Sequence, residues 1–161
     1  MTVDCTGNIT SEADEEVINF GEWQRLAQAA GIPVPPTAET DPAAFLVANR
    51  LLRIMRERGL AGSQAAVCTL GSRGVVAADW RKRVIYVMLL ELLNGNPGVP
   101  TPAGGGEVFL ARFMYLRRHW ARNGNLRHPI AAASLRAMHQ VADVLGLRRD
   151  QYVIRMTWQS L

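Results

Sequence analysis

A run of ten residues in the middle of the chain, VIYVMLLELL from Val84 to Leu93, is apolar except for Glu91. It is far shorter than the ~20 apolar residues that a membrane-spanning helix needs. A helix that is apolar nearly all round is one that other elements cover on every side. We therefore expect a long helix from Val75 to Leu93, with its second half buried at the centre of the fold.

Four further segments carry apolar residues at helical spacing, bounded by residues that start or stop helices. The first begins with SEAD, a capping-box pattern with Ser11 at the N-cap. The second has Asp41 as its cap and Pro42 in its first turn. These helices are predicted at 11–30, 41–58, 107–123 and 129–146.

The chain is therefore predicted to be mostly α: a single helical domain of five or six helices with extended N- and C-terminal arms. For residues 63–70 we favour a short helix. The alternative is a β-hairpin within 66–78 that turns at GSRG. The alternating pattern of 151–159 predicts a strand-like arm. The expected division is an acidic arm, helix and proline-rich linker at 1–40, a basic helical core at 41–150, and a C-terminal arm at 151–161.

The net charge of +4 is unevenly divided along the chain. Residues 1–41 hold eight acidic residues and a single arginine, whereas residues 42–161 hold six acidic and seventeen basic residues. Such asymmetry predicts an anionic partner for the basic part. The alternative is that the acidic segment itself neutralises the basic surface, within one chain or between neighbours.

The helix predicted at 107–123 has an aromatic stripe assigned to the core and an opposite face rich in cations. Arginine suits bidentate contact with phosphate, and a tyrosine among arginines can stack on a base. We therefore predict a nucleic-acid-binding surface that holds the phosphate backbone. Its candidate residues are Arg112, Tyr115, Arg118, His119, Arg122, Arg81, Lys82, Arg83, Arg50 and Arg53.

No motif in the chain specifies a reaction, so no catalytic residue, cofactor or metal ligand is predicted and the chain is not expected to be an enzyme. The histidines lack metal-ligand spacing. The stretch AGGGE at 103–107 could form an anion-binding nest, but it lacks the lysine and hydroxyl of a phosphate loop. We interpret it as a flexible hinge.

These features together favour a structural, self-assembling nucleic-acid-binding protein of the coat or nucleocapsid kind, with RNA a better candidate than DNA. The architecture is similar to that of all-helical coat proteins of filamentous viruses, without a sequence match. The subunit interface is predicted to be the apolar face of the C-terminal arm: Tyr152, Ile154, Met156 and Trp158. The alternative is a helical protein–protein interaction module, of adaptor or immunity type. No membrane partner is expected, and the location is soluble and intracellular, or the virion.

Overall fold

The computed structural model describes residues 3–4, 15–38, 40–57, 65–80, 82–93, 105–123 and 129–160. Within these ranges the elements follow one another as β1 (Val3–Asp4), β2 (Glu15–Asn19), α1 (Phe20–Ala29), α2 (Asp41–Glu57), β3 (Ala65–Thr69), the short 3-10 helix η1 (Gly71–Arg73), β4 (Gly74–Asp79), β5 (Val84–Leu92), α3 (Gly105–Asn123), α4 (Pro129–Val144) and β6 (Tyr152–Ser160). No helix in this part of the chain has the length and hydrophobicity of a membrane-spanning segment.

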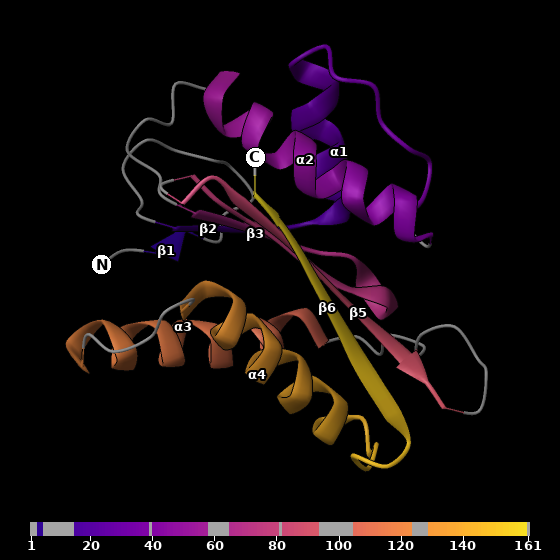
Figure 1. Cartoon of the computed structure of the whole chain (residues 1–161), viewed down its shortest axis with the longest axis vertical. Helices are drawn as coiled ribbons and strands as arrows, with labels where there is room; N and C mark the ends of the chain where they lie inside the picture. Colours follow the sequence, from indigo (N-terminus) through magenta and orange to yellow (C-terminus); the bar gives the residue numbers. More distant parts are fainter. Residues whose placement is uncertain are drawn as a thin grey trace.

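A mixed β-sheet forms the middle layer of the molecule (Figure 1). Its strands lie side by side in chain order, from β1 to β6. The first three strands are parallel to one another, and each later strand is antiparallel to its neighbour. Helices α1 and α2 cover one face of the sheet, and α3 and α4 cover the other. The fold is therefore a three-layer α/β arrangement.

Helices on both faces explain why the central strands lack a polar side. In β5, Ile85, Val87 and Leu89 face the α1–α2 layer. Their neighbours Val84, Tyr86, Met88 and Leu90 face the α3–α4 layer. A strand buried on both faces is a nearly continuous apolar run. The same composition therefore fits a buried strand as well as a buried helix.

The expected mostly α fold is thus wrong, and so is the long helix at 75–93. That segment forms β4 and β5, which pair in an antiparallel hairpin from Gly74–Leu89 to Asp79–Val84. At 66–78 the alternative prediction holds rather than the favoured helix, because β3 and β4 form a hairpin around η1. The predicted strand at 151–159 is present as β6, but it is a full member of the sheet, paired along its length with β5.

The first predicted helix is displaced. Residues Glu15–Asn19 form β2, and α1 begins only at Phe20. The proposed cap at Ser11 lies outside the described residues. The other three predicted helices are confirmed as α2, α3 and α4, with ends within two residues of those expected.

Candidate functional site

A pocket of about 340 Å³ lies where four separate parts of the chain meet. These parts are the β2–α1 junction, the β3–η1–β4 turn with the end of β5, the first turns of α3, and the C-terminal half of α4. The lining residues are Asn19, Phe20, Gly21, Thr69, Gly71, Gly74, Val75, Leu90, Gly106, Phe109, Met138, Val141, Ala142 and Leu145. The volume and the mostly apolar lining are typical of a site for a small molecule.

The wall at the β2–α1 junction is fixed by a capping box. The Oδ1 atom of Asn19 accepts a hydrogen bond from the backbone N–H of Glu22 at 2.9 Å, and the Glu22 carboxylate accepts one from the N–H of Asn19 at 2.8 Å. These bonds satisfy donors that a helix start leaves unpaired. Strand β2 therefore passes into α1 without an intervening loop, and Phe20 and Gly21 are held at the pocket.

The β3–η1–β4 turn depends on two glycines with positive φ. Gly71 has φ 61° and Gly74 has φ 140°. A Cβ atom on Gly74 would lie 2.1 Å from the carbonyl oxygen of Met88, so only glycine allows β4 to approach β5 this closely. The N–H of Leu70 donates to the carbonyl of Gly74 at 2.8 Å and closes the turn.

The first turn of α3 supplies the polar end of the pocket. Gly106 lines it, and a Cβ atom placed there would meet nothing within 4 Å. The N–H groups of a first helical turn have no partner inside the helix and carry a partial positive charge, which favours an anion. Glu107 follows Gly106 in the same turn and is exposed, but it is not among the residues that line the pocket. The pocket thus combines apolar walls with an end suited to negative charge.

Three of the predicted nucleic-acid-binding residues lie together on the exposed side of α3. The Tyr115 ring is 59% exposed and stacks on His119 with ring centroids 6.0 Å apart. The Arg112 guanidinium carbon lies 5.6 Å from the Tyr115 ring centroid. Arg118 and Arg122 are also in α3, but the placement of their side chains is not described.

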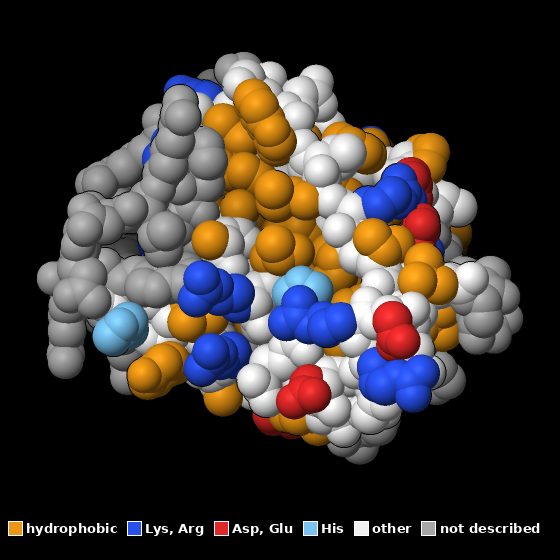
Figure 2. Space-filling view, turned by 60° about the horizontal axis from the view of Figure 1, so that its bottom comes forward, with side chains coloured by type: hydrophobic (Ala, Val, Ile, Leu, Met, Phe, Trp, Pro, Cys, Tyr) orange, Lys and Arg blue, Asp and Glu red, His pale blue; other side chains and the backbone are white. Residues whose placement is uncertain are grey.

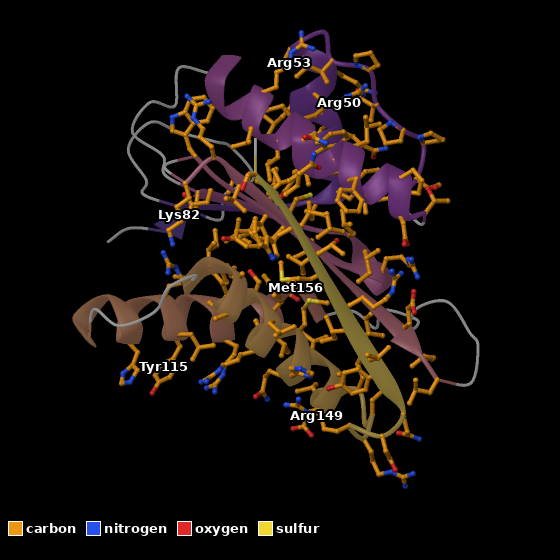
Figure 3. All side chains as sticks on the ribbon, in the orientation of Figure 1. Arg50, Arg53, Lys82, Tyr115, Arg149 and Met156 are labelled. Carbon is orange, nitrogen blue, oxygen red and sulfur yellow. The ribbon has the colours of Figure 1, made fainter. Side chains whose placement is uncertain are left out.

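The remaining basic candidates lie elsewhere, so the structure does not bring all of them onto one surface. Arg50 and Arg53 are on α2, on the opposite side of the sheet from Tyr115 (Figure 3). Lys82 and Arg83 lie in the β4–β5 turn, where the Arg83 guanidinium stacks 4.2 Å from the Trp80 ring centroid. Arg81 lies outside the described residues.

The four residues predicted as a subunit interface point to one face of β6 but differ in exposure. Tyr152 is buried and Ile154 is half-buried, whereas Met156 is 45% and Trp158 63% exposed. Strand β5 of the same chain pairs with all four, so the backbone edge of the arm that faces β5 is occupied within the molecule.

The pocket was missed at the sequence level, although part of its signal is local. The AGGGE stretch interpreted as a hinge contributes Gly106 to the pocket wall. This stretch forms part of a pocket only because α4 and the β3–β4 turn, which come from distant parts of the chain, supply the other walls. Within the described ranges, no group of three or more His, Cys, Asp or Glu side chains could hold a metal ion.

No protein-family model matches the chain, and no curated protein matches its sequence. Solved structures match its fold. A protein from Clostridium perfringens assigned as a sugar kinase aligns with a TM-score of 0.58 and 15% identity, over 94% of this chain and 44% of that one. From Staphylococcus aureus, a protein assigned as a phosphofructokinase has a TM-score of 0.49 and 12% identity, over 90% of this chain and 42% of that one. The pyridoxal kinase of the same organism, in complex with pyridoxal, has a TM-score of 0.49 and 14% identity, over 94% of this chain and 52% of that one.

The likeness to the sugar kinase structure shows that the two proteins share a three-layer α/β fold. The chain spans only about half the length of these solved structures.

The fold match contradicts the predicted coat or nucleocapsid function, with its RNA partner and its lack of enzymatic activity. The predicted virion location has no support. The coat or nucleocapsid prediction assumed an all-helical body with a C-terminal arm that forms the subunit interface, and the alternative interaction module assumed the same helical body. The body is instead a sheet between two helical layers, and the arm is a strand of that sheet.

Proposed function

We propose that the pocket binds a nucleotide and that the chain takes part in transferring a phosphoryl group to a small hydroxyl-bearing molecule. The observation that carries this proposal is an apolar pocket ending at the first turn of α3, near Gly106. The three-layer α/β fold, shared with a protein assigned as a sugar kinase, supports the same class of reaction.

The two ends of the pocket fit the two ends of a nucleotide. Phe109, Val141 and Leu145 supply apolar walls on which a planar base can pack. The N–H groups of the first turn of α3 would hold phosphate oxygens, because a helix N-terminus favours anions. The absence of a side chain at Gly106 lets a phosphate reach the backbone directly.

Glu107 is our candidate for the proton acceptor in the transfer. The bond between the terminal phosphorus of the donor and its bridging oxygen breaks, and a new bond forms from that phosphorus to the acceptor oxygen. The hydroxyl proton of the acceptor passes to the Glu107 carboxylate. The pocket would contribute mainly by positioning the donor and stabilising its charge, as is general for phosphoryl transfer.

Titration of the purified chain with ATP and magnesium, followed by calorimetry, tests nucleotide binding. We expect saturable binding that Leu145→Trp reduces at least tenfold, because the larger ring fills the pocket. Val144→Trp is the matched control: Val144 is the adjacent residue, is 59% exposed and does not line the pocket. Equal effects of the two substitutions, or no binding by the unaltered chain, would contradict the proposal.

The role of Glu107 is tested by measuring ADP formation from ATP, with and without a panel of pentoses and hexoses. Glu107→Gln should lower turnover by about 10²–10⁴-fold, the usual contribution of a general base. Nucleotide affinity should be unchanged, since the carboxylate is assigned to the acceptor proton only. Turnover that is unaffected by the substitution would remove Glu107 from the reaction.

A further inference from the structure

A second pocket, of about 590 Å³, lies on another side of α4, outside the proposed nucleotide site. It is bounded by α3, by α4 and by the turn that joins α4 to β6. Helix α4 lines it with residues 136, 139, 140 and 143, which recur along one stripe. The nucleotide pocket uses a different stripe, residues 138, 141, 142 and 145. The two pockets are therefore separated by the thickness of one helix.

The second pocket carries a net positive charge. Four arginines line it, Arg112 from α3, Arg136 from α4, and Arg148 and Arg149 from the turn, whereas Asp143 is the only carboxylate among its lining residues. Arg148 is paired with Asp150 at 3.1 Å, so the other three arginines are the candidates to hold an anion. Figure 2 shows several lysine and arginine side chains near a histidine on the face where α3 and α4 lie, with acidic side chains among them. Like charges that converge from different elements repel one another, and a bound anion would offset that cost.

The pocket also contains a part-buried hydrogen-bonded pair. Nδ1 of His139 lies 2.6 Å from the hydroxyl of Tyr152, the buried first residue of β6. Burial and the neighbouring Arg149 lower the pKa of His139, which favours the neutral imidazole. When the Tyr152 hydroxyl donates to Nδ1, the ring proton is on Nε2, where it is a donor for a ligand.

We propose that this second pocket binds a small anion through a phosphate group, held by Arg112, Arg136 and Arg149 with His139 as a further donor. Guanidinium groups bind phosphate through paired hydrogen bonds, and several of them around one cavity favour a dianion over chloride. The proposed ligand is free phosphate or a small phosphate ester, bound independently of the nucleotide.

The binding experiment uses inorganic phosphate, glycerol 3-phosphate and glycerol as probes, at constant ionic strength maintained with sodium chloride. Calorimetry should show saturable binding of the first two and none of glycerol. Tighter binding of glycerol 3-phosphate would identify a phosphate ester as the ligand, and equal binding would identify free phosphate. The absence of saturable phosphate binding, or its loss in moderate sodium chloride, would overturn the proposal.

Variants locate the bound anion. The double variant Arg112→Gln/Arg149→Gln should weaken phosphate binding at least tenfold. Arg25→Gln is the matched control, since Arg25 is an exposed helical arginine on α1, across the sheet. Leu145→Trp, which fills the nucleotide pocket, should leave phosphate binding unchanged. If phosphate binding were lost in Leu145→Trp and kept in the double variant, the anion would be bound in the nucleotide pocket, at the first turn of α3. That result would refute the second site.

Histidine NMR signals of the unaltered protein report where phosphate binds, without the need for a variant whose stability could differ. Phosphate should shift the ring signals of His139 and leave those of His119 in place, because His119 lies outside the pocket, on the exposed side of α3. Circular dichroism of each variant checks that it is folded. A shift of His119 alone would overturn the assignment.

Discussion

Strands β5 and β6 are neighbours of equal length, nine residues each, paired along their whole length, and yet their surroundings are opposite. The first seven residues of β5 are buried, whereas Tyr152 is the only buried residue of β6. Strand β5 has a strand on each side and a helical layer on each face. Strand β6 has no described strand on its outer side, and the helices cover only its beginning. The exposure of a strand is thus set by its place in the sheet.

The comparison also explains the two sequence patterns. At the start of β6, Tyr152 and Ile154 pack against the α3–α4 layer and alternate with the exposed Val153 and Arg155, so the period of two predicted a strand correctly. Strand β5 needs apolar side chains on both faces, which removes the alternation and leaves a pattern that also fits a buried helix.

The largest loss of stability is expected from a substitution at Gly74, where β4 approaches β5. Gly74→Ala should prevent folding or cost several kcal/mol, because the new Cβ would lie 2.1 Å from the Met88 carbonyl oxygen at a φ of 140°. Gly106→Ala, where the Cβ meets nothing, should change stability by less than about 1 kcal/mol. Denaturant unfolding of both variants checks this. Equal stability would mean that β4 and β5 are not packed as described.

Met88 and Met156 provide a direct test of the difference between the strands, because they are cross-strand partners with the same side chain. Met88 is fully buried and Met156 is 45% exposed. Met88→Ala should lower the free energy of unfolding by roughly 2–5 kcal/mol, and Met156→Ala by less than about 1 kcal/mol. Chemical denaturation measures both. A large loss at Met156 would show that β6 is covered in solution by something outside the described chain.

An ion-pair network that joins β5 and β6 to α2 gives a smaller contrast. Asp41 accepts from Arg73 at 3.2 Å and from Arg155 at 3.0 Å, and Arg155 also donates to Glu91. The side chain of Arg73 is 10% exposed and that of Arg155 44%. Asp41→Asn should cost about 1–3 kcal/mol, since it removes the charge that compensates a buried guanidinium.

Arg155→Gln is the matched comparison and should cost less than about 1 kcal/mol, because an exposed ion pair contributes little. Thermal and denaturant unfolding of the two variants measure the difference. If Arg155→Gln proved the more costly, the link from β6 to the rest of the fold would be stronger than its exposure indicates.

The smallest effect is expected in the pH dependence of stability. It arises from His139, which is hydrogen-bonded to Tyr152, the one buried residue of β6. The pKa of His139, hydrogen-bonded to Tyr152, is lowered below its ordinary value of 6.5. The unfolded chain therefore takes up this proton first as the pH falls. Stability should decline as the pH drops below about 6.5 and level off once the folded protein is also protonated. Unfolding midpoints between pH 8 and 5 should fall less in His139→Gln; an identical profile would contradict the pKa direction.

Local signals predicted the three helices α2, α3 and α4, because caps and a 3.6-residue period depend only on nearby residues. They also predicted that cations cover one side of α3. They did not place Arg112 beside Arg149, since α4 and the turn before β6 bring these residues together. For the same reason, AGGGE could be recognised as glycine-rich but not as a pocket wall.

The sequence by itself determined where most helices begin and end, the strand character of residues 151–159, and the apolar character of Val84–Leu92. Only the tertiary structure decided that this apolar run is a strand between two helical layers, and that the β2–α1 junction, the β3–β4 turn, α3 and α4 enclose a pocket. Helical hydrogen bonds join residues four apart. Sheet hydrogen bonds and pocket walls join residues far apart in the chain, so their partners cannot be identified from local pattern alone.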